Sequence, residues 1–143
     1  MTQDLERART LLSEDGNTFC VVKSEYVITS QSKGVAPVID ILGNEPEFLE
    51  GASAADKVIG KSSALLLVLG NVKEAYAEII SEHALKVLES SGIPVEYNRL
   101  VPYIKNRSKT GMCPMEKAVL ETDDPEEAFD ILRNKIGEMQ VGH

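Results

Sequence analysis

Several kinds of residue are scarce in this chain of 143 residues, and each scarcity excludes a class of protein. Tryptophan is absent, aromatic residues make up 5% of the chain, and cysteine occurs only as Cys20 and Cys113. Two cysteines, one in an apolar run and one beside a proline, do not form the disulfide framework of a small secreted domain. The cysteine content therefore favours a reducing, cytoplasmic environment.

Long apolar runs are also missing. The longest extends from Ala64 to Leu69, well short of the roughly 18 to 20 residues that a membrane-spanning helix needs. The first ten residues, MTQDLERART, lack the apolar region of a secretory signal peptide. We therefore expect no membrane partner and a cytoplasmic location.

The chain does contain enough apolar material for one folded domain. Its hydrophobic content is 43%, and its length lies within the usual range of a single domain. No internal repeat, low-complexity tract or Gly/Ser linker divides the sequence. We expect a single domain over residues 1–143.

The charge is acidic overall but unevenly distributed. The formal net charge is -8, which argues against general nucleic-acid binding because such proteins usually carry a basic surplus. The segment Asn98–Lys117 nevertheless has five basic residues and one acidic residue, namely Arg99, Lys105, Arg107, Lys109 and Lys117 against Glu116. This segment is either a solvated basic loop or a local site for an anion.

Apolar spacing and turn residues predict an α/β fold. The expected order is a helix over Asp4–Glu14, a hairpin of Phe19–Lys23 and Tyr26–Ser30, a helix over Val35–Leu42, a buried helix over Ser53–Leu69, a strand over Ala75–Ile80, a helix after Ser81, a strand over Val95–Leu100, a short helix from Pro114 to Leu120 and a last helix from Asp124. Helical crossovers between the later strands imply a mixed sheet. The fold class is therefore a three-layer α/β/α sandwich.

The helix expected over Ser53–Leu69 carries two lysines. Ser53 and Asp56 have the spacing of a capping box, which would place Lys57 and Lys61 four residues apart near the positive end of the helix. Like charges and the helix dipole both disfavour this arrangement. An anion should lie nearby, and either Asp56 or Glu116, or a bound phosphate or carboxylate, could supply it.

Residues 55–62, ADKVIGKS, imitate the end of a phosphate-binding loop. The first glycine of that motif is missing, and the segment is predicted to be the interior of a helix, so we exclude nucleotide hydrolysis. A glycine inside a helix costs about 1 kcal/mol relative to alanine. Gly60 is therefore expected to permit close packing or the approach of a ligand.

Three residues are candidates for chemistry. Cys113 would cap the helix that begins at Pro114, where nearby basic residues favour a reactive thiolate; the alternative is a small buried cysteine. Glu116 is either a carboxylate of the first helical turn or a proton carrier. His83 lies in the first turn of its helix, where the dipole favours neutral imidazole, or is simply exposed. Cys20 is predicted to be core.

The segments AADKVIGKSSALL (54–66), AYAEIISEHAL (75–85) and GMCPMEKAV (111–119) resemble a prokaryotic family, the domain of unknown function 1893. The resemblance extends from about Asp15 to Glu121. It implies a cytidine-deaminase-like fold in which the helix expected at Ser53–Leu69 and the helix after Ser81 meet at the site.

The resemblance does not carry the zinc ligands of a deaminase. The deaminase pattern begins the first helix with His-x-Glu or Cys-x-Glu and the second with Pro-Cys-x-x-Cys, whereas this chain offers residues 55–57, ADK, and residues 81–85, SEHAL. His83 and Cys113 together would be one ligand short of a catalytic zinc site. We expect no metal and no other cofactor.

Two functional hypotheses follow. The favoured one is a binding module for a nucleotide-like or other anionic metabolite, contacted by Asp56, Lys57, Lys61, Asn106 and Arg107. The alternative is a metal-independent enzyme with Cys113 as nucleophile and His83 or Glu116 handling protons. A protein-interaction subunit is a third reading, and self-association fits all three.

Overall fold

The computed structural model describes the backbone of residues 2–141 and the side chains of residues 2–138. The elements follow in the order α1 (Gln3–Leu12), β1 (Phe19–Lys23), β2 (Tyr26–Ser30), α2 (Ala36–Asn44), a 3-10 turn (Pro46–Phe48), β3 (Ser53–Ile59), α3 (Lys61–Leu69), β4 (Glu74–Ser81), α4 (Glu82–Ser90), β5 (Val95–Val101), α5 (Pro114–Ala118) and α6 (Pro125–Val141). No described helix combines the length and the apolar character needed to cross a bilayer.

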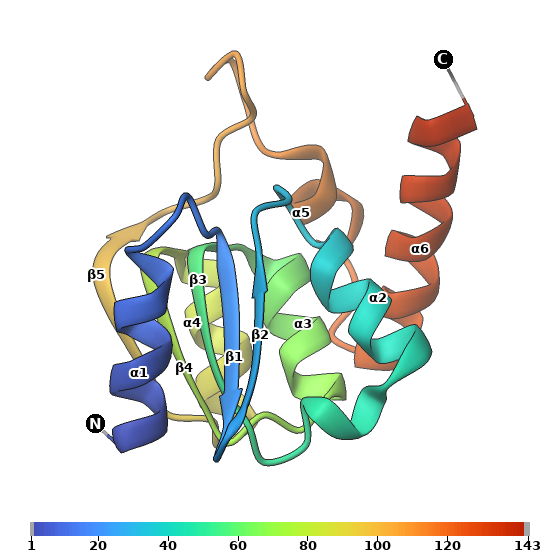
Figure 1. Ribbon diagram of the computed structural model, residues 1–143. Coiled ribbons are helices and arrows are strands. Elements are labelled where there is room, and N and C mark those ends of the chain that lie inside the picture. The colour runs from blue at the N-terminus through green and yellow to red at the C-terminus, as the bar shows by residue number, and fades with distance from the viewer. Residues whose placement is uncertain (1, 142–143) are drawn as a thin grey trace.

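The five strands form one mixed sheet in the order β2-β1-β3-β4-β5. β1 pairs antiparallel with both β2 and β3, while β3, β4 and β5 run parallel. The carboxyl ends of these three parallel strands therefore meet at one edge of the sheet, which we call the carboxyl edge. The loop after β5 and the short helix α5 lie above this edge in Figure 1.

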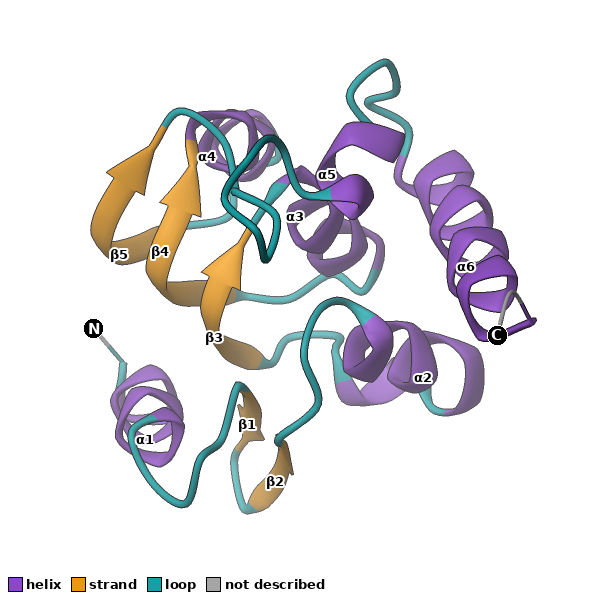
Figure 2. Cartoon of the chain, turned by 90° about the horizontal axis from the view of Figure 1, so that it is seen from above, coloured by secondary structure: helices purple, strands orange, loops and turns teal. Residues whose placement is uncertain are grey.

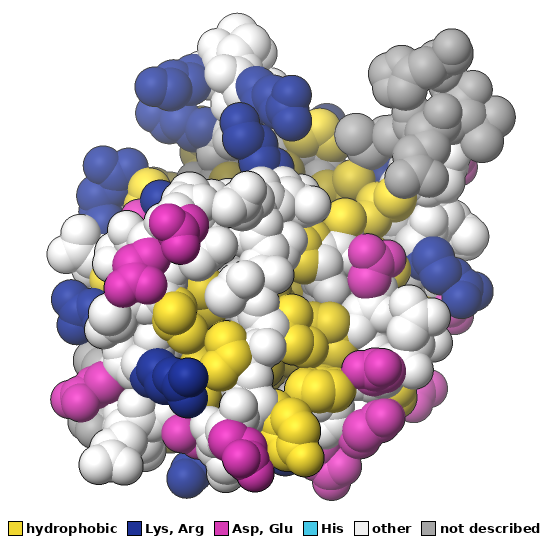
Figure 3. All heavy atoms as spheres, in the orientation of Figure 1, with side chains coloured by type: hydrophobic (Ala, Val, Ile, Leu, Met, Phe, Trp, Pro, Cys, Tyr) yellow, Lys and Arg dark blue, Asp and Glu magenta, His cyan; other side chains and the backbone are white. Residues whose placement is uncertain are grey.

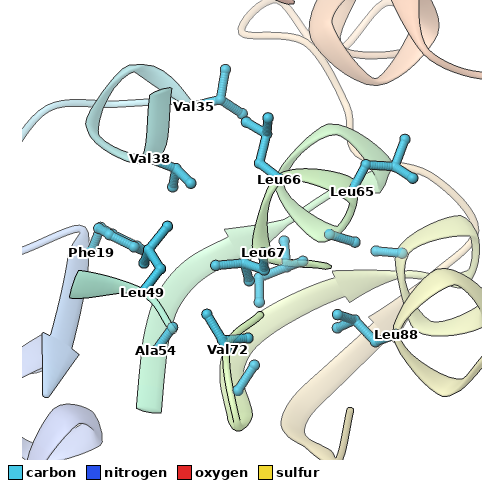
Figure 4. Close-up of a cluster of buried hydrophobic side chains, with 14 of the residues drawn as sticks. Phe19, Val35, Val38, Leu49, Ala54, Leu65, Leu66, Leu67, Val72 and Leu88 are labelled. Carbon is cyan, nitrogen blue, oxygen red and sulfur yellow. The ribbon is translucent and has the colours of Figure 1, made fainter. Parts of the chain in front are cut away.

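Helices cover the sheet on both faces, which confirms the three-layer α/β/α arrangement. α1 covers one face, and α2, α3 and α4 lie on the other, with α6 packed against α3 (Figure 2). β1 alternates accordingly: Phe19 and Val21 enter the larger core, and Cys20 and Val22 enter the smaller core beneath α1. Figure 4 shows the larger core, where leucines of α3 meet side chains of β1 and α2.

Most of the predicted elements are confirmed, but the helix expected over Ser53–Leu69 is wrong. Residues Ser53–Ile59 form the central strand β3, and the helix begins only at Lys61. The first four residues of β3 are all buried, so small residues such as Ala54 and Ala55 line both faces of the strand without the alternation that marks a half-buried strand. Gly60 caps α3 instead of lying inside a helix.

Candidate functional site at the carboxyl edge

The Glu116 carboxylate joins three segments at the carboxyl edge. Its Oε2 accepts hydrogen bonds from the backbone N–H of Lys61 and the hydroxyl of Ser81, both at 2.6 Å. Its Oε1 accepts the backbone N–H of Ile104 at 2.7 Å. The residue is 1% exposed. Glu116, carried by α5, therefore ties together the start of α3, the end of β4 and the loop after β5.

Gly60 leaves the space that Glu116 occupies. A Cβ atom added at Gly60 would lie 3.0 Å from Glu116 Oε2 and 3.0 Å from Cγ1 of Ile104. These distances are shorter than ordinary van der Waals contact between packed atoms. The glycine therefore permits close approach, which is one of the two roles expected for it.

We expect Gly60→Ala to lower the free energy of unfolding by about 1–2 kcal/mol, because the added methyl group must displace a buried carboxylate and Ile104. Gly43→Ala is the matched control: Gly43 lies in α2, and an added Cβ there meets nothing within 4 Å. That change should be neutral or stabilising by roughly 0.5–1 kcal/mol. Urea unfolding measures both, and equal stability of the two variants would contradict the tight contact.

The start of α3 also corrects the account of residues 55–62. They run from strand through Gly60 into a helix, which is the setting of a phosphate-binding loop and not the interior of a helix. The N-terminus of α3 already pairs with the Glu116 carboxylate, however. An internal anion thus occupies the position where a helix N-terminus would hold a phosphate.

Lys57 and Lys61 do not share a helix, so their expected spacing on one helix is wrong. Lys57 is a half-buried residue of β3, whereas Lys61 opens α3. Lys61 is 7% exposed, and its Nζ donates to the carbonyl of Leu120 at 2.8 Å and pairs with Asp123 Oδ1 at 3.0 Å. Its ammonium group therefore holds the segment before α6.

Asn106 organises the loop between β5 and α5, residues 102–113, which we call the basic loop. Its Oδ1 accepts the backbone N–H of Thr110 at 3.0 Å and the hydroxyl of Ser108 at 3.3 Å. The backbone N–H of Asn106 donates to the Gly111 carbonyl at 2.9 Å. Lys109 has a left-handed backbone with φ of 58°. These bonds fold the tip of the loop into a hairpin and present Arg107 to solvent.

The basic charge of residues 98–117 lies on the surface, and the acidic charge does not. Glu116 is buried. Figure 3 shows Lys and Arg side chains gathered on the loop that projects at the top of the molecule. The exposed basic residues are Arg99, Lys105, Arg107, Lys109 and Lys117. The segment therefore presents positive charge to solvent, and its one carboxylate, that of Glu116, is not at the surface to neutralise it.

Cys113 and His83 occupy the predicted helix starts. Cys113 is half-buried and immediately precedes α5. Its backbone N–H donates to the Ile104 carbonyl at 2.7 Å, whereas its thiol makes no capping hydrogen bond. His83 is exposed in the first turn of α4, whose cap is the Ser81 hydroxyl.

The third candidate, Glu116, accepts three hydrogen bonds and is buried. This geometry indicates a structural role for its carboxylate.

Asp56 lies in the middle of β3 and is 8% exposed. Its Oδ1 accepts the backbone N–H of Val58 at 3.2 Å. Burial raises the pKa of this carboxyl to about 8, and the backbone hydrogen bonds only partly oppose the effect. Burial, with smaller contributions from Asp56 and Glu14, also raises the pKa of the Cys20 thiol to about 11. Cys20 is fully buried, as predicted.

Sequence reasoning missed four partners of Lys61 and Glu116. Asp123 and the Leu120 carbonyl receive the Lys61 ammonium group, and the Ser81 hydroxyl and the Ile104 N–H donate to the Glu116 carboxylate. Ser81 was expected only as a helix cap, and no local signal marks its second hydrogen bond. The Asp123 contact depends on how the segment before α6 returns to α3, which the sequence does not encode in any spacing.

Two surface hollows lie beside α1, away from the carboxyl edge. Their volumes are about 340 and 350 Å³, one lined by Thr2, Leu5, Glu74, Pro94 and Glu96, the other by Arg9, Thr10, Ser13, Tyr76 and Glu78. Neither is lined by a predicted site residue. Within the described residues, no three His, Cys, Asp or Glu side chains are grouped to hold a metal ion.

The fold and this edge define a mixed α/β domain with a basic loop anchored over the carboxyl ends of its parallel strands. The chain belongs to the TM1506 family, a domain of unknown function (DUF1893), which matches residues 7–136. It is similar to the crystal structure of a DUF1893 family protein, TM1506, from Thermotoga maritima, with a TM-score of 0.86 and 29% sequence identity over 94% of this chain and 92% of that one. No curated protein matches the chain.

Proposed function

We propose that this protein is a binding module for an anionic small metabolite, of nucleotide-like chemistry, and that the basic loop provides the contacts. The observation that carries the proposal is the exposure of Lys105, Arg107 and Lys109 while Glu116 is buried and bonded internally. In open α/β sheets, ligands bind outside the carboxyl ends of the strands. The basic loop is anchored at that position through Ile104.

Within this proposal we assign the anion to fewer residues than the sequence offers. Lys61 is engaged with Leu120 and Asp123, and Asp56 is buried within β3. Neither is therefore assigned to the ligand.

Arg107 is the principal anion contact in this proposal. Lys105 and Lys109 lie beside it in the loop, and Lys57 lies in the sheet itself. The planar guanidinium group of Arg107 can bind a phosphate or carboxylate through two parallel hydrogen bonds. Asn106 shapes the loop for this contact.

We also propose that the layout is cytidine-deaminase-like. The mixed sheet, with α3 and α4 starting from neighbouring parallel strands and packing together, supports this. α3 begins with Lys61-Ser62 and α4 with Glu82-His83. These starts do not follow the zinc-ligand pattern of the deaminases. The likeness therefore concerns the scaffold and not the zinc chemistry.

Calorimetric titration tests the binding proposal. The ligands are AMP, ATP, pyrophosphate and citrate, added to the parent and to the triple variant Lys105→Gln, Arg107→Gln, Lys109→Gln. We expect one of these anions to bind the parent and the triple variant to bind it at least about tenfold more weakly, since each charge-assisted hydrogen bond contributes roughly 1–3 kcal/mol. Raising the ionic strength should weaken the parent's binding.

The matched control removes the same charge elsewhere. Arg7→Gln, Lys33→Gln, Lys73→Gln alters three basic residues that are also exposed but lie outside the basic loop. It should change the affinity less than about twofold, apart from weak long-range effects. An equal loss in both triple variants, or a parent that binds none of the four anions, would contradict the proposal.

The alternative function is a metal-independent enzyme with Cys113 as nucleophile. Cys113 is the last residue of the basic loop, and its half-buried thiol makes no capping hydrogen bond, which favours this reading. The same titration separates the two functions. Binding that survives Cys113→Ser supports the module, whereas turnover of a bound anion that is abolished by Cys113→Ser supports the enzyme.

A further inference from the structure

β5 is an edge strand of the sheet. It is last in the sheet order, so none of the residues that the structure describes forms a strand along its outer side. Its five inner residues, Glu96 to Leu100, are all exposed. Tyr97 and Leu100 are each 41% exposed, which places two large side chains on this strand in water.

β5 lacks the features that protect edge strands from pairing. Natural edges are blunted by lysine, by proline or bulges within the strand, or by short length. β5 has seven residues, Pro94 and Pro102 lie outside it, and its charged residues are only Glu96 and Arg99. The opposite edge, β2, has five residues, and its exposed Tyr26 packs edge-on against Phe48.

The residues of β5 are complementary to themselves when the strand is reversed. If two copies pair antiparallel about a two-fold axis through Asn98, Tyr97 faces the partner's Arg99, and Asn98 faces its own copy. The end valines, Val95 and Val101, also face each other. Glu96 faces the partner's Leu100, so no like charges stand directly opposite, and each arginine can lie against a tyrosine ring.

We propose that β5 is the interface of a homodimer in which two sheets join through antiparallel β5–β5 pairing. A two-fold contact of this kind uses one surface patch twice and closes after two copies. The pairing gives each outer backbone N–H and C=O of β5 a hydrogen-bond partner. It also covers Tyr97 and Leu100. The inference does not depend on the ligand of the basic loop.

Disulfide trapping tests the register. Asn98→Cys, in a Cys113→Ser background, places two thiols at directly opposed positions, where Cβ atoms lie roughly 4.5–5.5 Å apart. Cys20 is fully buried and does not compete. Glu96→Cys in the same background is the control, because its two copies would be four residues out of register, about 13 Å apart. Oxidised glutathione should link the first variant and not the second.

Sedimentation equilibrium tests the interface independently. Tyr97→Lys places a lysine opposite Arg99 and should raise the dimer dissociation constant at least about tenfold. Tyr26→Lys alters an exposed tyrosine on the other edge strand and should change the dimer dissociation constant less than about twofold. A parent that is monomeric at every concentration studied would overturn the proposal. So would a dimer that withstands Tyr97→Lys and is not trapped through position 98.

Discussion

Asp56→Asn is expected to make the protein more stable than the parent at pH 8 to 9. Burial raises the pKa of the folded-state carboxyl from an ordinary value of 3.8 to about 8. The folded state therefore holds a proton that the unfolded state releases above pH 4. Stability from this group is complete below about pH 4 and is lost as the pH rises to about 8. The free energy of unfolding of the parent should fall by roughly 2–5 kcal/mol over this pH range.

The asparagine variant removes this dependence and keeps the local bond. Its side-chain oxygen can still accept the Val58 N–H, and its size is nearly the same. We expect the two proteins to have nearly the same free energy of unfolding at pH 4, where the carboxyl is largely protonated in both the folded and the unfolded parent, and the variant to gain steadily from there to about pH 8. Urea unfolding at several pH values between 4 and 9 measures the difference.

Asp40→Asn is the control for this experiment, because Asp40 is an exposed residue of α2. The difference in the free energy of unfolding between this variant and the parent should not change with pH over the same range. If the Asp56→Asn curve also ran parallel to the parent curve, the Asp56 carboxyl would be ionised in the folded protein. The protein would then carry a buried charge that some other group must balance.

The sequence predicts most helices and strands because their signals are local. The hairpin of β1 and β2 comes from two β-rich runs around a two-residue turn, and Ser24 in that turn has a left-handed φ of 56°. α6 begins at Pro125 after Asp124, as the acidic cap and proline indicate. These elements need no knowledge of distant residues.

β3 could not be recognised in the same way. The burial of its first four residues in succession removes the alternation of a half-buried strand, and Ser53 and Asp56 imitate a helix cap. The Ser53 hydroxyl instead donates to the buried Glu74 carboxylate at 2.5 Å. Gly60 after Ile59 was the available signal, because a glycine between two apolar runs also marks the turn from a strand to a helix.

The candidate site divides along the same line. The basic loop and the helix starts at Ser81 and Cys113 could be predicted from neighbouring residues. The sequence offers Glu116 as an anion close to Lys61, and the structure brings the two together, but through the Lys61 backbone N–H. The partners of the Lys61 ammonium group, the Leu120 carbonyl and Asp123, could not be predicted, because they lie about 60 positions away in the chain. The donors of Lys61, which are suited to hold a ligand anion, are instead occupied by the protein's own carboxylate and carbonyl groups.

Glu116→Ala is expected to lower the free energy of unfolding by roughly 3–6 kcal/mol. Its loss leaves the buried donors of Lys61 and Ser81, and the partly buried N–H of Ile104, without their acceptor. Each unsatisfied buried group costs about 1–3 kcal/mol. The backbone amides of Lys61 and Ile104 should also exchange hydrogen faster, because the basic loop and α3 lose their common anchor. Urea unfolding and amide hydrogen exchange measure the two effects.

Two further variants separate the carboxylate from the volume of the side chain. Glu116→Gln keeps the size and one acceptor oxygen, so the loss should be smaller, about 1–3 kcal/mol. With that oxygen toward Lys61 and Ser81, the amide group turns a donor toward the Ile104 N–H. Exchange should then rise mainly at Ile104. Lys117→Ala, at the next and exposed position of α5, should change stability by less than about 0.5 kcal/mol. If Glu116→Ala were as mild as this control, the carboxylate would not anchor the basic loop, and the loop's position over the carboxyl edge would need another cause.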